Sequence, residues 1–198
     1  MVDLSFCSLA DRRTAYRRSG QGEGALLVHG ITSNSFVWRE IVPRLSESFD
    51  VISIDLQGCG GSDLSLDADY SIAAQAESTA GFIRALYHRE LLDDELMALF
   101  WDQMSTGERR RAFLKLARSL NNEQLLAIED DLRDLDFPTL ILRGEVDIYL
   151  SATICERLHS DIAGSRLERI NTGGHFLQLD EPDWVVEHLL GFLPESSR

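Results

Sequence analysis

The chain has 198 residues and is acidic, with 19 basic against 33 acidic residues and a formal net charge of −14. A typical domain holds about 150 residues, so this length predicts a single domain with a core of its own. Hydrophobic residues at 44% and charged residues at 26% exclude a disordered or collagen-like chain. The negative charge repels phosphate backbones and anionic headgroups, so we expect neither nucleic acid nor a membrane as a partner.

The cysteines and the first residues indicate the compartment. Cys7, Cys59 and Cys155 are widely spaced and form no CxxC pair, which predicts neither a disulfide framework nor a zinc site. The N-terminus lacks the basic and apolar regions of a signal peptide, and no apolar run approaches the roughly 20 residues of a membrane span. We therefore expect a cytoplasmic protein.

The first part of the chain has the pattern of a hairpin followed by parallel strands. Residues 2–9 and 12–19 predict the two strands of the hairpin. The runs ALLVHG (25–30) and VISIDLQG (51–58) are apolar, rich in branched residues and stopped by glycine, which is typical of strands buried on both faces of a parallel sheet. Residues 35–48 between them predict the crossover helix.

The last part repeats this alternation. TLILRG (139–144) and SRLERI (165–170) predict two more strands, with a helix over 152–162 between them. Alternating strands and helices indicate an α/β fold with a mostly parallel sheet and right-handed crossovers.

The middle of the chain, from Ser71 to Asp136, is helical in pattern instead. Ser71 is a suitable N-cap for a helix over residues 72–86, whose apolar residues recur every three or four positions. The stretches 91–104, 108–120 and 123–135 have helical periodicity as well. The sequence predicts no buried strand in this region.

In an open parallel sheet the chemistry lies in the loops after the carboxyl ends of the strands. His29, Gly30 and Ile31 follow the first predicted core strand, and a sharp turn at the glycine would leave the Ile31 amide free to bind an anion. The glycine-rich turn over 55–63 follows the second. Here we favour a structural interpretation, in which the glycines adopt positive φ and Asp55 and Ser62 bind backbone amides, and we interpret Cys59 as an unactivated thiol.

The two late strands are followed by an acid and a histidine. Asp147 comes shortly after residues 139–144, and His175 shortly after residues 165–170. Both would meet at the top of adjacent strands, where a carboxylate can fix the tautomer of a general-base imidazole. We therefore identify Asp147 and His175 as candidate catalytic residues.

Four motifs together resemble the α/β-hydrolase superfamily. They are HGITSNSFVWREIVPRL, DLQGCGGSD, LRGEVD and GGHFLQLDEP. The resemblance is to the capped branch with meta-cleavage-product hydrolases, epoxide hydrolases and haloalkane dehalogenases. It implies that His29, Gly30 and Ile31 form the oxyanion turn, and that Asp147 and His175 are the triad acid and base. It also implies a core built from residues 1–86 and 137–198 with a partial helical cap over 87–136.

The sequence departs from the family at the nucleophile. The family places it in a G-x-S-x-G elbow between the glycine turn and the acid, and this interval contains neither the motif nor a strand to present it. Ser78 has a similar outline but lies within the helix predicted over 72–86. Ser33 and Ser35 follow the oxyanion turn, where local hydrogen bonding is the simpler interpretation. The nucleophile is therefore unknown.

Three hypotheses follow from this departure. The first is hydrolysis of a small ester or a carbon–carbon bonded ketone by Asp147, His175 and an unidentified nucleophile. The second is a non-catalytic, shortened homologue that serves as a ligand-binding or partner-binding scaffold. The third is a different reaction of the Asp147–His175 pair, such as activation of water. We expect a small-molecule ligand and neither a metal nor an organic cofactor. The family's strands near the nucleophile elbow are missing from this sequence, and where their absence leaves exposed sheet edges we expect a homodimer.

Overall fold

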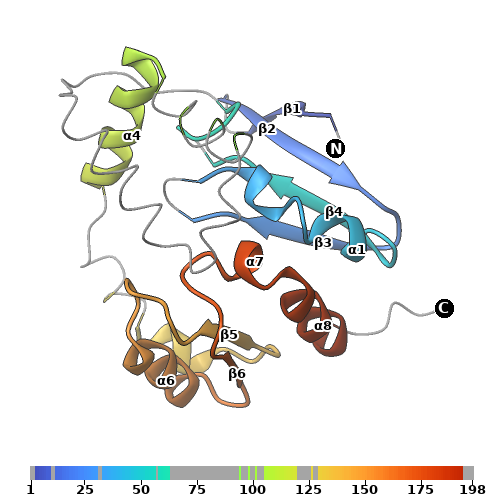
Figure 1. Cartoon of the computed structure of the whole chain (residues 1–198), viewed down its shortest axis with the longest axis vertical. Helices are drawn as coiled ribbons and strands as arrows, with labels where there is room; N and C mark the ends of the chain where they lie inside the picture. The colour runs from blue at the N-terminus through green and yellow to red at the C-terminus, as the bar shows by residue number, and fades with distance from the viewer. Residues whose placement is uncertain are drawn as a thin grey trace.

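The structure is a computed structural model of the whole chain (Figure 1). It describes most of the N-terminal third and nearly all of the C-terminal third. The described residues are 3–9, 12–30, 33–56, 58–62, 94, 98, 101, 105–119, 126 and 129–193.

The N-terminal strands form a four-stranded sheet in the order β1-β2-β4-β3. Strands β1 (Ser5–Leu9) and β2 (Arg12–Ser19) pair antiparallel, which confirms the predicted hairpin. Strands β3 (Glu23–Val28) and β4 (Phe49–Ile54) pair parallel from Glu23 opposite Phe49 to Val28 opposite Ile54. Because β2 also pairs antiparallel with β4, this sheet is mixed.

The C-terminal strands form a second sheet of two strands. β5 (Leu140–Gly144) and β6 (Arg166–Ile170) are parallel, and α6 (Ala152–Asp161) connects them, as the sequence predicts. Among the described strands, β3 and β5 each end their sheet, so the two sheets do not join. The homodimer expected from such edges stays a prediction.

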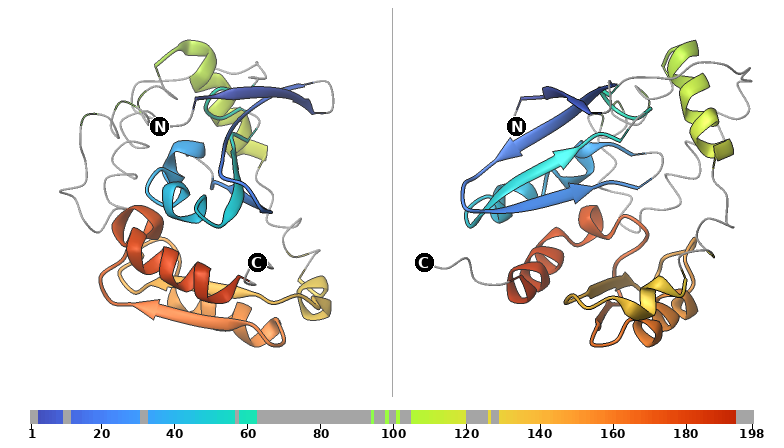
Figure 2. Two further views of the ribbon diagram at one scale, coloured as in Figure 1. Left: turned by 90° about the vertical axis from the view of Figure 1, so that its right-hand side faces the viewer. Right: turned by 180° about the vertical axis from the view of Figure 1, so that it is seen from behind.

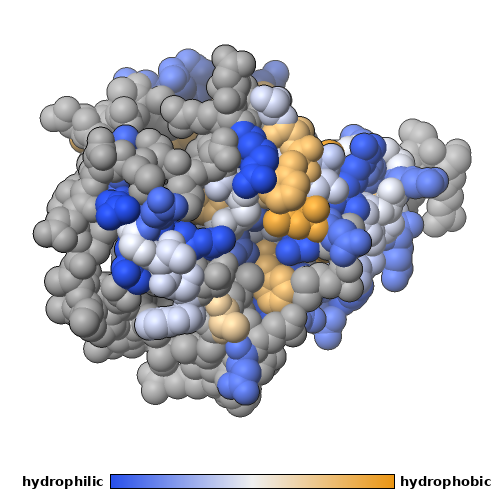
Figure 3. Space-filling model, turned by 90° about the horizontal axis from the view of Figure 1, so that it is seen from above, coloured by the Kyte–Doolittle hydropathy of each residue, from blue (hydrophilic) through white to orange (hydrophobic). Residues whose placement is uncertain are grey.

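The expectation that the strand after residue 24 is buried on both faces is wrong. On β3, Leu26 is 62% and Val28 47% exposed. Alternate residues of β4 are buried on the face that carries Val51 and only partly buried on the other. The described helices thus cover one face of this sheet, and the side chains of Leu26 and Val28 lie on the other. Figure 3 shows hydrophobic residues exposed beside hydrophilic ones on the face seen from above.

The core lies between the N-terminal sheet and the C-terminal helices. The helix predicted over 35–48 is a 3-10 turn, η1 (Ser35–Trp38), followed by a short α1 (Val42–Leu45), because Pro43 fits only the first turn of a helix. Two helices, α7 (Leu177–Asp180) and α8 (Pro182–Phe192), lie between the two sheets in both views of Figure 2. The buried residues that join these elements are Ile41, Leu45, Phe49, Val51, Leu177, Val185 and Val186.

Partly buried residues tie the second sheet to this core. Leu142 of β5 and Ile170 of β6 pack against the buried cluster. Arg44 of α1 and Asp183 of α8 form an exposed ion pair at 2.6 Å, which joins these two helices. The C-terminal helices therefore hold the carboxyl ends of β5 and β6 in a fixed relation to the N-terminal sheet.

Of the helical middle region, the structure describes α4 (Gly107–Ser119) and the 3-10 turn η3 (Asp131–Asp134). In Figure 1, α4 lies at the opposite end of the molecule from β5 and β6. The helix predicted over 72–86 and most of the predicted cap lie outside the described residues. None of the described helices has the length and apolar character needed to span a membrane.

Candidate functional site

The loops after β5 and β6 bring Asp147 and His175 together. Nδ1 of His175 lies 3.0 Å from Oδ2 of Asp147, within hydrogen-bond distance. The Asp147 side chain is 9% exposed and the His175 side chain 35% exposed. Because the carboxylate only accepts, Nδ1 carries the proton and donates it, which leaves Nε2 as the basic nitrogen of the ring. Within the described part of the chain, Nε2 of His175 has no hydrogen-bond partner.

Backbone amides fix the other oxygen of Asp147. Oδ1 accepts hydrogen bonds from the amides of Tyr149, at 2.8 Å, and Leu150, at 3.0 Å. Desolvation by itself raises the pKa of Asp147. The hydrogen bonds from the Leu150 amide, His175 and the Tyr149 amide outweigh this effect, so the pKa lies below its ordinary value. Asp147 is therefore an ionised carboxylate with both oxygens engaged.

The two loops touch through their backbones at a pair of glycines. A Cβ atom on Gly144 would overlap the carbonyl group of Gly173, so only glycine fits there. The amide of Val146 donates to the carbonyl of Gly173 at 3.1 Å. Asp180, which is buried, accepts the amide of Gly174 at 3.0 Å. These contacts set the spacing between the acid loop and the base loop.

Aromatic rings flank the imidazole of His175. Tyr149 meets it edge to face with ring centroids 5.2 Å apart, and Phe176 does so at 5.4 Å. Phe176 is buried, whereas Tyr149 is 49% exposed. Two rings on a half-exposed imidazole restrict its rotation and leave one edge of it open to a substrate.

His29 occupies a different environment. It is 3% exposed, and Nε2 accepts the amide of Leu56 at 2.9 Å. Nδ1 then carries the proton and donates it to the carbonyl of Gly30 at 2.7 Å. Burial lowers the pKa of His29, which keeps the ring neutral. Both nitrogens therefore bind backbone, and a ligand could reach the ring only by replacing one of these bonds.

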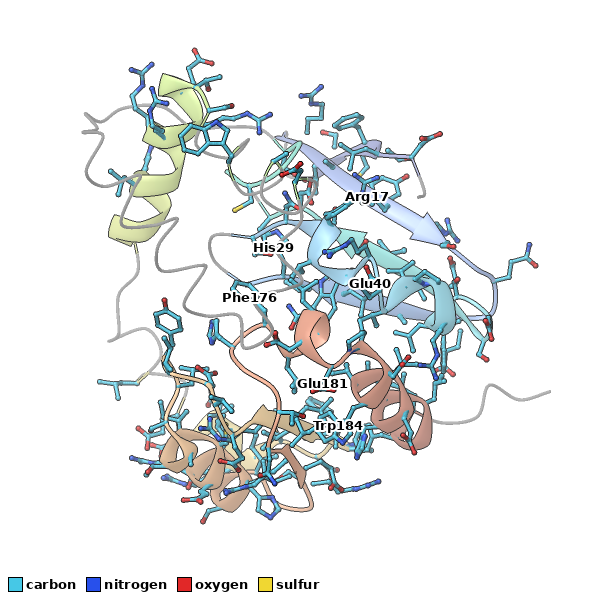
Figure 4. The ribbon with its side chains drawn as sticks, in the orientation of Figure 1. Arg17, His29, Glu40, Phe176, Glu181 and Trp184 are labelled. Carbon is cyan, nitrogen blue, oxygen red and sulfur yellow. The ribbon has the colours of Figure 1, made fainter. Side chains whose placement is uncertain are left out.

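The structure describes the predicted oxyanion turn only in part. Gly30 is exposed directly after β3, and Ile31 lies outside the described residues. The 3-10 turn η1, which follows this segment, packs against α7, which follows His175. Figure 4 accordingly shows Phe176 at the start of α7 facing the end of β3 that carries His29.

The glycine turn after β4 is structural, as the sequence predicts. Asp55 is buried and accepts the amides of Ser35, at 2.7 Å, and Gly61, at 2.8 Å. Ser62 donates its hydroxyl proton to the Asp55 carbonyl at 2.6 Å and accepts the amide of Ala15 at 2.8 Å. Gly60 has φ +51°, and a Cβ there would overlap the Asp55 carboxylate.

The described candidates for a nucleophile are all buried. Burial, followed by the nearby charge of Asp55, raises the pKa of the Cys59 thiol to about 11, which makes it an unreactive thiol. Ser33 and Ser35 are 1% and 3% exposed, and the Ser33 hydroxyl points to the Asn34 carbonyl at 3.4 Å. Ser78 lies outside the described residues.

Three residues near the pair were not predicted from the sequence. Tyr149 carried no signal, because exposed aromatic residues are common in loops. Asp180 and Arg143 are charged residues that the structure buries, and a single sequence gives no sign of such burial. Among the described residues, no group of three or more His, Cys, Asp or Glu side chains is arranged to hold a metal ion.

Comparisons with known proteins identify the fold. Residues 26–100 match the family model for the alpha/beta hydrolase fold. The chain is 35% identical over 104 residues to a pimeloyl-(acyl-carrier protein) methyl ester esterase from Aeromonas hydrophila, a match covering 52% of this chain and 40% of the esterase.

Solved structures with low sequence identity share the fold over nearly the whole chain. An alpha/beta hydrolase fold protein from Burkholderia ambifaria superposes with a TM-score of 0.85 and 20% identity, over 96% of this chain and 98% of its own. A meta-cleavage product hydrolase from Pseudomonas fluorescens superposes with a TM-score of 0.77 and 18% identity, over 99% of each chain.

The chain therefore has the α/β-hydrolase fold. It spans about a quarter to two-fifths of the length of curated sequence relatives such as the esterase. These similarities define the fold of the protein, and the chemistry depends on the residues of the site.

Proposed function

We propose that the chain is a hydrolase of a small ester or a carbon–carbon bonded ketone, with His175 as the general base and Asp147 as the residue that orients it. The observation that carries the proposal is the 3.0 Å contact between His175 and Asp147. The carboxylate is fixed by two amides, and the partly exposed imidazole keeps Nε2 unbound within the described residues. A ring held in this tautomer is prepared to accept a proton.

The proposed reaction follows from these roles. Nε2 of His175 accepts the proton of an attacking hydroxyl or water, whose oxygen adds to the substrate carbonyl carbon. The negative charge that forms on the carbonyl oxygen is stabilised by the turn at Gly30 and Ile31. His175 then returns the proton to the leaving alkoxide or carbanion as the bond between the carbonyl carbon and the leaving group breaks, and Asp147 stabilises the imidazolium in between. Where a side-chain hydroxyl has attacked, water then releases the acyl group by the same sequence of proton transfers.

The substrate class is supported by the matched proteins. A relative that is 35% identical over 104 residues is named an esterase of a methyl ester. A structural neighbour is named a meta-cleavage product hydrolase. Both names describe hydrolases, so an ester or an activated ketone is the substrate class to test first.

The nucleophile separates two versions of the proposal. No G-x-S-x-G motif is present in the sequence, and the described serines after the oxyanion turn are buried. Either a residue outside the described ranges attacks the carbonyl, or His175 activates water directly. A fluorophosphonate probe distinguishes the two, since it labels an activated hydroxyl and does not label water.

The experiment measures p-nitrophenyl acetate turnover and intact mass after fluorophosphonate treatment for three proteins: wild type, His175→Ala and His159→Ala. His159 is the matched control, an exposed histidine whose Nδ1 binds the Ser165 hydroxyl at 2.9 Å in place of a carboxylate. We expect turnover in wild type and His159→Ala and none in His175→Ala. A probe adduct would identify a nucleophile, and turnover without an adduct would identify activated water.

The alternative is a non-catalytic scaffold. It predicts equal, background hydrolysis by wild type and His175→Ala across a panel of small esters and ketones. In that case ligands raise the melting temperature without being converted. Such a result would overturn the proposed hydrolase function.

A further inference from the structure

Arg143 is a buried charged residue beside the acid loop. It lies near the end of β5, and its side chain is 4% exposed. Its Nη1 donates a hydrogen bond to the carbonyl of Leu150 at 2.8 Å, and its Nε lies 3.6 Å from the Glu145 carboxylate. A buried guanidinium loses its hydration, so it remains buried only where specific partners compensate for that loss.

The partner of Arg143 is the residue that also holds Asp147. Leu150 donates its amide to Oδ1 of Asp147 at 3.0 Å, while its carbonyl accepts from Arg143. Asp147 in turn binds His175 through Oδ2. A continuous series of hydrogen bonds thus runs from β5 through Leu150 and Asp147 to the imidazole.

We propose that Arg143 is a positioning residue, which fixes the end of the acid loop so that Asp147 meets Nδ1 of His175. Without this anchor the carbonyl of Leu150 is free to turn, and the amide that orients Asp147 shifts with it. The planar guanidinium suits this task because Nη1 binds the Leu150 carbonyl while Nε, which has no hydrogen-bond partner among the described residues, lies 3.6 Å from the Glu145 carboxylate. The catalytic consequence rests on the proposed function, whereas the effect on the His175 ring does not.

The neighbouring strand provides a matched control. Arg169 of β6 is the direct cross-strand partner of Arg143. It also contacts Glu145, at 3.2 Å, but its second partner is Glu156, at 2.6 Å, and not the acid loop. Arg143→Lys and Arg169→Lys both keep the charge, and only the first removes the guanidinium that binds Leu150.

The test is the tautomer of His175, measured by long-range ¹H–¹⁵N correlation spectra of histidine-labelled protein above pH 7.5. We expect wild type and Arg169→Lys to carry the proton on Nδ1. In Arg143→Lys we expect a major fraction with the proton on Nε2, the tautomer that free imidazole side chains prefer. We also expect kcat for p-nitrophenyl acetate to fall about 10- to 100-fold in Arg143→Lys with KM nearly unchanged, since small displacements of a catalytic group have effects of this size.

The role of Arg143 and the proposed function are tested by different measurements. If His175 keeps its proton on Nδ1 in Arg143→Lys, the role of Arg143 is overturned, even if the variant melts at a lower temperature than wild type. If Arg143→Lys does not fold, Arg143→Gln replaces it, and an unchanged tautomer in that folded variant overturns the proposal in the same way. If wild type shows no turnover, the proposed function fails, and the tautomer still decides the role of Arg143.

Discussion

Two turns of the molecule place a histidine shortly after a strand, and the contacts of the two histidines differ. After β3, His29 is 3% exposed and binds backbone through both ring nitrogens. After β6, His175 is partly exposed, binds Asp147 through Nδ1 and keeps Nε2 unbound within the described residues. The difference shows that a position after a strand does not by itself leave a histidine nitrogen available to a substrate. His29 has no such nitrogen, whereas His175, within the part of the chain that the structure describes, has Nε2.

The largest expected effect comes from Asp147→Asn. An amide at this position can still accept from the amides of Tyr149 and Leu150, but its other end no longer requires the proton on Nδ1 of His175. We expect turnover to fall about 10⁴-fold, as in Ser-His-Asp triads that lose the orienting carboxylate. Ester turnover and urea unfolding measured on the same preparation check this. A loss of less than tenfold would contradict the role of Asp147.

The next largest effect is a difference in stability between variants of the two histidines. His29→Phe fills a similar volume but leaves the Leu56 amide and the Gly30 carbonyl without their buried partner. We expect the free energy of unfolding to fall by about 2–4 kcal/mol, because each unsatisfied buried group costs about 1–3 kcal/mol. His175→Phe should change it by less than about 1 kcal/mol. Equal effects in urea denaturation would remove the distinction between the two turns.

Gly144→Ala tests the contact between the acid loop and the base loop. The added methyl group overlaps the Gly173 carbonyl, so the backbone of one loop has to move. We expect a loss of about 1–3 kcal/mol in stability, typical of overpacking, together with reduced turnover. Gly191→Ala is the control, since a Cβ on Gly191 meets no atom within 4 Å. Indistinguishable turnover in the two variants would refute the coupling of the loops.

The smallest effect is a pH dependence of stability. The folded-state pKa of His29 is lowered by burial, so below about pH 6.5 the unfolded state binds more protons than the folded state. Stability is therefore full above pH 6.5 and decreases as pH falls from there toward the folded pKa, by at most about 1.4 kcal/mol per pH unit. Asp147 acts in a separate window, because its lowered pKa gives stability that disappears only below its ordinary, more acidic value.

Guanidinium denaturation at pH 7.5 and 5.5 measures this dependence, with His29→Phe as the reference. The variant should lose less stability between the two pH values than wild type. An equal loss in both proteins would assign the dependence to other groups.

The strands could be predicted from the sequence because their signals are local. Runs of branched apolar residues ended by glycine located β3, β4 and β5, and the run SRLERI located β6, each to within a few residues. The exposure of one face of β3, which carries Leu26, could not be predicted. It depends on which other elements cover the sheet. α8 was not predicted, because the motif that leads into it, GGHFLQLDEP, was interpreted for its histidine and the residues after it were not analysed for helical periodicity.

The candidate site could likewise be predicted only where the signal in the sequence is local. The acid and the histidine were found because both follow strands whose carboxyl ends meet. The engagement of both nitrogens of His29 and the burial of Arg143 depend on contacts between residues far apart in the chain. A local pattern contains no record of such contacts, so the sequence placed His29 at the site and did not single out Arg143.

The most direct test of the account is modification of histidines by diethyl pyrocarbonate, followed by peptide mapping and ester turnover on the same samples. This reagent acylates an unprotonated, accessible imidazole nitrogen. We expect His175 to be modified while His29 is protected, and turnover to fall in proportion to the modified fraction of His175. Modification of His29 at the same rate as His175, or full turnover after complete modification of His175, would contradict the proposed role of His175.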